Sequence, residues 1–136
     1  MAAFARQFDV LVDTNISKKA LLKNLLFSKI PYNVERFINA DVANTLRQLL
    51  SENNYDFIQI EGAFVVYYID LIKELTDIPI LVRTHNIEYI IWQRLALNES
   101  NIFKKWYFNL LAKRLKKFEK KYYNKADAIA AITFED

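Results

Sequence analysis

Cysteine is absent from the 136-residue sequence, and glycine, histidine and proline are scarce, with one Gly, one His and two Pro. Without cysteine there is no disulfide framework, no thiol nucleophile and no Cys-ligated zinc or iron–sulfur site. A single glycine excludes both the dinucleotide-binding fingerprint and the phosphate-binding P-loop, because each needs at least two glycines. One histidine would leave zinc to carboxylates, which is uncommon. We therefore expect neither a metal site nor a bound cofactor.

Long apolar runs are also missing. No window approaches the roughly 18 apolar residues that a membrane-spanning helix needs, and Asp9 and Asp13 interrupt the apolar N-terminal segment, so it does not resemble a signal peptide. No serine lies in a G-x-S-x-G elbow, which leaves a serine hydrolase with little support. We expect a cytoplasmic protein, since the lack of cysteine fits a reducing compartment.

The sequence is rich in apolar residues: 53 % are hydrophobic and 15 % aromatic. A chain of this length has room for one domain with a core, but not for two. Apolar spacing and helix breakers predict the order of the elements. We expect a helix over 18–29 capped by Ser17, a helix capped by Asp41, a strand over 57–62, a helix over 64–77, a strand over 78–84, helices over 87–98 and 103–124, and a strand over 128–133.

The order of strands and helices indicates the architecture. Strands separated by helices cannot form hairpins, so they should lie parallel with right-handed crossovers. The apolar runs IPILV and AIAAI are typical of strands that helices cover on both faces. The sequence therefore predicts an α/β fold with a three-layer parallel sheet, in which ligands would gather at the carboxyl ends of the strands.

Polar residues follow the predicted strands at those ends. Glu61 and Gly62 close the first strand, the segment RTHNIE follows the second, and Thr133 closes the third. Four side chains in RTHNIE carry groups that can bind a polyol or a phosphate: Arg83, His85, Asn86 and Glu88. We expect a functional role for His85, the only imidazole of the chain.

A structural interpretation of the same residues stays open. Arg83 and Glu88 could form a surface ion pair, and Asn86 could cap a helix that starts at Ile87. Glu61 could be exposed at a cleft or paired internally. Gly62 could allow a tight exit from the strand or let another part of the backbone approach closely.

The basic residues are concentrated in one element. Residues 101–125 contain nine Lys or Arg and a single acid, Glu119. Such a helix can simply be solvated on one face and packed on the sheet with the other. Because only Glu119 relieves the repulsion along the charged face, we also expect an anionic partner, either a membrane surface, a lipid-linked phosphate or a nucleic acid. The candidate contacts are Lys113, Lys116, Lys117 and Lys120.

The segment LVRTHNIEYIIWQRLA and the following KKWYFNLLAKRLKKFEKKYYNKADAIAAIT resemble the N-terminal domain of family 4 glycosyltransferases. The resemblance extends from about Ile30 to the end of the chain. It implies a GT-B architecture, in which two Rossmann-like domains face a cleft, and retaining transfer of a sugar from a nucleotide-sugar donor to an acceptor in polysaccharide or glycolipid synthesis. This chain would be the acceptor-side half, and the acceptor would be a glycan or a lipid-linked molecule.

The resemblance also assigns roles to residues. It implies that His85 is catalytic and faces the cleft near the donor sugar, with Glu61 and Asn86 beside it. Gly62, Arg83 and Glu88 match the local pattern as further substrate-binding residues, and Thr133 matches the cleft-side end of the last strand.

Two parts of the family pattern are missing from this chain. The first strand with its glycine-containing loop is absent, and so is the second domain, which binds most of the nucleotide. The fragment alone is therefore expected to be inactive. The strand 57–62 would keep an unpaired edge, so we expect either that residues 8–13 partly fill the gap or that the chain associates with itself. The alternative function is a non-enzymatic module that binds anionic lipid or nucleic acid through helix 103–124, at the inner face of the membrane in the case of lipid.

Overall fold

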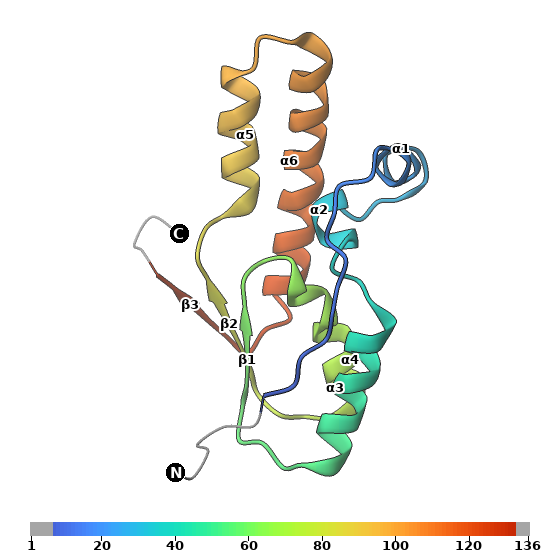
Figure 1. The fold of residues 1–136 in the computed structure, drawn as a ribbon. Helices are drawn as coiled ribbons and strands as arrows, with labels where there is room; N and C mark the ends of the chain where they lie inside the picture. Colours follow the sequence, from blue (N-terminus) through green and yellow to red (C-terminus); the bar gives the residue numbers. More distant parts are fainter. Residues whose placement is uncertain (1–6, 133–136) are drawn as a thin grey trace.

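The computed structural model describes residues 7–132. It is an α/β fold with a three-stranded parallel sheet in the order β1-β2-β3 (Figure 1). The strands are β1 (Ile58–Glu61), β2 (Ile80–Thr84) and β3 (Ala128–Ala131). All three strands were predicted, as was their parallel arrangement, although each is shorter than the range predicted for it. Thr133 lies outside the described residues.

The helices follow the predicted order with two additions and one correction. They are α1 (Lys18–Phe27), α2 (Tyr32–Glu35), α3 (Ala40–Glu52), the 3-10 turn η1 (Val65–Tyr68), α4 (Ile69–Leu75), α5 (Glu88–Asn98) and α6 (Ile102–Tyr123). The Ser17 side chain caps α1 as expected, by accepting a hydrogen bond from the Ala20 N–H. Asp41 does not cap α3: its cap is Asn39, whose Oδ1 accepts from the backbone N–H of Asp41 at 2.6 Å. The short helix α2 and the 3-10 turn η1, which directly precedes α4, were not predicted.

A second helical layer, expected from the sequence, is absent from the described residues: α3, α4 and α6 lie toward one face of the sheet, and α5 lies beyond the carboxyl ends of the strands (Figure 1). Ile60, Ile80 and Val82 point toward the helices and are buried. Gln59 and Arg83 point to the opposite face and are exposed. A parallel sheet normally carries helices on both faces, so this sheet has one face that is available to further structure.

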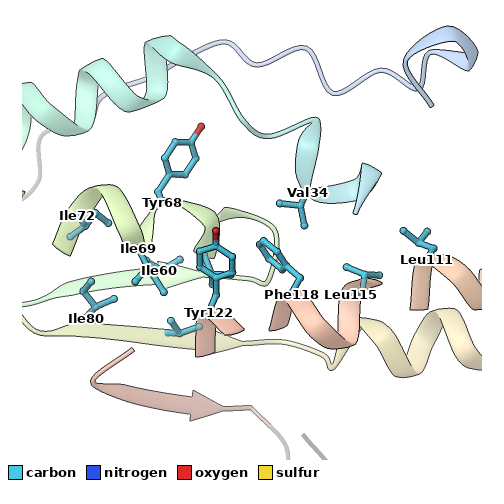
Figure 2. Close-up of a cluster of buried hydrophobic side chains, with 12 residues drawn as sticks. Val34, Ile60, Tyr68, Ile69, Ile72, Ile80, Leu111, Leu115, Phe118 and Tyr122 are labelled. Carbon is cyan, nitrogen blue, oxygen red and sulfur yellow. The ribbon is translucent and has the colours of Figure 1, made fainter. Parts of the chain in front are cut away.

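The core lies between the sheet and the helices α4 and α6 (Figure 2). Helix α6 supplies Leu111, Leu115, Phe118 and Tyr122, whose spacing places them on one side of the helix. The rings of Phe118 and Tyr122 pack at 4.5 Å between centroids. This packing holds α6 in register along the sheet, and α5 lies antiparallel to α6 as the other half of a helical hairpin beyond the carboxyl ends of β1 and β2 (Figure 1).

The outer edge of β1 has no partner strand within residues 7–132. Residues 8–13 form no strand, and Leu11 is 96 % exposed, so the version in which this segment fills the sheet is wrong. The N-terminal segment instead runs to α2, where Arg36 donates to the Thr14 carbonyl at 2.6 Å. Self-association through the open edge stays a prediction.

A proline at the edge tests that self-association. The backbone N–H groups of Ile58 and Gly62 donate to β2, so alternation points the Gln59 N–H outward. Gln59→Pro therefore removes an outward donor without breaking the ladder to β2, and proline is tolerated on edge strands. We expect the wild-type chain to sediment as a dimer or larger species and Gln59→Pro to shift it toward monomer. A wild-type chain that sediments only as a monomer contradicts this prediction.

Candidate functional site

Glu61 is the centre of a cluster of polar side chains at the carboxyl end of the sheet. Its Oε2 lies 3.0 Å from Nε2 of His85, and its Oε1 accepts from Nη1 of Arg83 at 3.4 Å and from the Gln59 side chain. The register explains the arrangement: Glu61 lies opposite Arg83 in the β1–β2 ladder, and His85 follows two residues later. Glu61 is thus both exposed at the strand end and paired, which combines the two alternatives left open by the sequence.

These contacts keep Glu61 ionised. The hydrogen bond from Gln59 lowers the pKa of Glu61, and the charge of Arg83 together with the hydrogen bonds from Arg83 and His85 acts in the same direction. All the partners are about half exposed, so the pairs contribute little to stability. Their main effect is on geometry, because an ionised Glu61 holds the His85 ring through Nε2. Within the described residues, the other ring nitrogen of His85, Nδ1, has no hydrogen-bond partner.

A small hollow of about 170 Å³ lies beside this cluster. Five of the predicted site residues line it, Glu61, Gly62, His85, Asn86 and Glu88, together with Phe37, Ala63, Phe64 and Val65. Arg83 does not line it, and the Arg83 side chain contacts the site through Glu61. The hollow is smaller than the usual 300–1,000 Å³ of a small-molecule site, so it can hold only part of a ligand.

Gly62 shapes the wall of the hollow. Its φ is +86°, in the left-handed region that side chains rarely adopt, and its N–H donates to the Arg83 carbonyl at 3.0 Å. Among the described residues, no atom outside Gly62 and its two chain neighbours lies within 4 Å of the position that a Cβ would occupy. Gly62 therefore allows the tight exit from β1, and it does not serve a close approach of another part of the backbone.

The structural interpretation of RTHNIE is wrong in two respects. Arg83 pairs with Glu61 and not with Glu88. Asn86 does not cap α5, because the residue at the cap is Ile87 and no side chain of the cap bonds to the helix. The exposed Asn86 side chain is therefore available to a ligand in the hollow.

Helix α5 is capped from a distant part of the chain, by Glu119 of α6. Oε1 of Glu119 accepts a hydrogen bond from the backbone N–H of Glu88 at 2.8 Å. Glu119 is only 3 % exposed, and its Oε2 is buried without a hydrogen-bond partner in the described residues. Burial raises the pKa of Glu119 to about 7, against the effect of the backbone hydrogen bonds, and burial raises the pKa of Glu88 as well.

Sequence reasoning missed this role of Glu119. We expected it to relieve repulsion on the exposed lysine face, but it points inward. The signal was its spacing: Glu119 follows the core residue Leu115 by four positions and precedes Tyr122 by three, so it shares their face of α6. A lone acid on a buried face indicates a partner in another element, here the first turn of α5.

A larger hollow of about 680 Å³ lies along α6, away from the strand ends. We refer to it as the basic groove. Its lining residues are Lys29, Ile30, Tyr67, Leu110, Lys113, Arg114, Lys117, Phe118, Lys121 and Tyr122. Of the four lysines predicted as anion contacts, Lys113 and Lys117 line the groove, whereas Lys116 lies over the Tyr89 ring of α5 and Lys120 is exposed elsewhere. Lys29 was missed because the link between α1 and α2 is remote from α6 in the sequence.

Comparisons with family models, with curated proteins and with solved structures find no match for this chain. Within residues 7–132, no helix combines the length and the apolar character that crossing a membrane requires.

Proposed function

We propose that this chain is the acceptor-side half of a two-domain retaining glycosyltransferase of the GT-B type, which transfers a sugar from a nucleotide-sugar to a glycan or lipid-linked acceptor. The observation that carries the proposal is the contact between Glu61 and His85 at the carboxyl edge of parallel strands. That edge is where ligands of α/β sheets bind. The resemblance of the RTHNIE segment to family 4 glycosyltransferases supplies the chemistry.

Each residue of the cluster has a definite part in the proposal. His85 contacts the donor sugar near the reacting centre through Nδ1, while Glu61 fixes its ring through Nε2. Asn86 and Glu88 offer hydrogen-bonding groups to sugar hydroxyls in the hollow. Arg83 positions Glu61.

The limited volume of the hollow agrees with half of an active site. A space of about 170 Å³ encloses too little of a nucleotide-sugar to bind it alone. A second domain would supply the nucleotide site and close the cleft, and the fragment without it should not transfer sugar.

The flanking coding sequence gives a direct test. We expect the reading frame beyond Asp136 to encode a second α/β domain, and the protein carrying both domains to consume a nucleotide-sugar that the 136-residue chain leaves intact. Release of the nucleoside phosphate, followed by chromatography across a panel of nucleotide-sugars, measures this activity. A stop codon after Asp136 with no second α/β domain encoded nearby counts against the proposal.

The alternative function, binding of an anionic partner without catalysis, is favoured by a separate observation. In the described residues, the basic side chains that form ion pairs are Lys73, Arg83, His85 and Lys125. The lysines of α6 therefore have no carboxylate partner within residues 7–132. Uncompensated lysines on one helix attract an anion. The two functions are compatible, because a transferase with a lipid-linked acceptor would work at the inner face of a membrane.

A further inference from the structure

The basic groove combines unpaired cations with an apolar floor. Lys113, Lys117 and Lys121 recur every four residues along α6, and Lys29 lies on the opposite wall. All four are exposed, and no carboxylate of residues 7–132 forms an ion pair with them. Like charges at this helical spacing repel each other, so an anion in the groove is stabilised by several cations at once.

Arg114 has a structural role in the groove. Unlike the lysines, its guanidinium group is already hydrogen-bonded within the chain. Its Nη1 donates to the carbonyl and the Oδ1 of Asn24, at 3.4 and 3.2 Å, and its Nη2 donates to the Leu25 carbonyl at 3.0 Å. These bonds tie α1 to α6 and fix the distance between the two walls. The four lysines are then the exposed cations of the groove, and Nζ of Lys121 lies 4.8 Å from the centre of the Tyr122 ring.

The floor determines what kind of anion fits. It consists of Ile30, Tyr67, Leu110, Phe118 and Tyr122, and Tyr122 packs against both other rings. The lining contains no Asp, Glu, Asn, Gln, Ser or Thr, so the only side-chain acceptors are tyrosine hydroxyls. Nucleic-acid bases and free sugars carry donors that would stay unpaired on such a surface. A phosphate attached to a hydrocarbon body matches both the rim and the floor.

Two large apolar side chains are exposed at the end of α1. Leu26 and Phe27 are 65 % and 82 % exposed, and they precede Lys29 of the groove by three and two residues. The same helix carries Lys18, Lys19 and Lys23. Large exposed apolar residues among lysines are typical of helices that lie in the interface of an anionic bilayer. This neighbourhood favours a lipid within a membrane over a free phosphate.

We propose that the basic groove binds the phosphate head group of an anionic bilayer lipid between Lys29 and the stripe Lys113, Lys117 and Lys121, with part of the hydrocarbon on the aromatic floor. Leu26 and Phe27 enter the bilayer beside it. The proposal gives the anionic partner of the alternative function a site and a chemical class, and it does not depend on sugar transfer.

Two variants of equal charge separate the groove from general basicity. The groove variant is Lys113→Gln with Lys117→Gln and Lys121→Gln, and the matched control is Lys105→Gln with Lys116→Gln and Lys120→Gln on the same helix outside the groove. Co-sedimentation with phosphatidylcholine vesicles, with and without phosphatidylglycerol, measures binding. We expect binding only with phosphatidylglycerol, weakened at least about tenfold in the groove variant and less than about threefold in the control.

The outcomes divide clearly. Equal weakening of both variants, or no binding to phosphatidylglycerol vesicles at low salt, overturns the proposal. Groove-dependent binding of a single-stranded oligonucleotide without vesicle binding assigns the groove to nucleic acid and also overturns it. Short-chain phosphatidic acid should bind more tightly than inorganic phosphate, and equal affinities would rule out a role for the floor. Circular dichroism checks that both variants fold, and activity of the two-domain enzyme is measured separately, so failure here leaves the sugar-transfer proposal intact.

Discussion

The free energy of unfolding should fall as the pH rises from 4.5 to about 7, and Glu119→Gln should remove most of this dependence. Glu119 is buried in the folded chain, and burial raises its pKa from 4.5 to about 7. In that pH window the folded state therefore holds a proton that the unfolded state has released. Because the unfolded state binds fewer protons, stability decreases with increasing pH.

The size of the effect follows from the shift. Each pKa unit corresponds to about 1.4 kcal/mol, so the loss across the window is at most about 3.5 kcal/mol. That is a large part of the total stability of an ordinary domain, about 5–15 kcal/mol. The contribution is complete below pH 4.5 and is lost by the time the pH has passed about 7.

Glutamine isolates the ionisation from the hydrogen bond. Gln at position 119 keeps an Oε1 that can accept from the Glu88 N–H, but it cannot ionise. Urea unfolding at several pH values should show a much flatter profile for Glu119→Gln and an unchanged slope for the control Glu52→Gln, which removes the same charge at an exposed site. Burial raises the pKa of Glu88 too, so a small slope of the same sign should remain. A wild-type profile without this slope, or a slope that Glu119→Gln leaves intact, contradicts the assignment.

Glu119 also connects stability to the candidate site. The turn that carries His85 and Asn86 lies between β2 and the first turn of α5, and that first turn is held by Glu119. Oε1 of Glu119 accepts from one of the N–H groups that a helix leaves without a partner at its start. Removing the acceptor altogether should therefore loosen the turn beside the hollow, in addition to its effect on unfolding.

The sequence predicted those parts of the fold that depend on residues close together in the chain, such as helix positions and helix caps. Apolar spacing places α6 to within one residue at each end, and the Ser17 cap of α1 is a local choice. The cap of α3 was wrong because Asn39 and Asp41 are both suitable capping residues two positions apart, and the extended backbone at Asn39 decides between them.

The parts that residue patterns alone did not predict depend on distant segments. The Glu61–His85 contact, which only the family resemblance implied, needs the register of β1 and β2, and the cap of α5, which was missed, needs the docking of α6. Lys29 joins the basic groove only because Arg114 holds α1 against α6. A second helical layer was expected because the strands are apolar. An apolar strand shows only that helices can cover both of its faces, and not that they do. In β3 the alanines are small enough to stay exposed or half-buried at little cost.

His85→Ala should lower the turnover of the two-domain enzyme by more than about tenfold, because a hydrogen bond to a charged group contributes about 1.5–3 kcal/mol. Glu61→Gln should give a smaller loss, since Gln keeps a partner for Nε2 of His85 but lacks the charge that fixes the ring. If Glu61 acts through His85, the double variant should be no worse than His85→Ala alone.

A control variant, together with separate measurement of kcat and KM, makes this result specific to His85. Arg94→Ala changes an exposed residue of α5 away from the hollow and should keep near-normal turnover. A transition-state role for His85 lowers kcat with little change in KM, whereas a contact made equally with bound substrate raises KM alone. Near-normal kcat and KM in His85→Ala would reduce the Glu61–His85 pair to a surface contact at the sheet edge, and the proposed half-site would then lose its central residue.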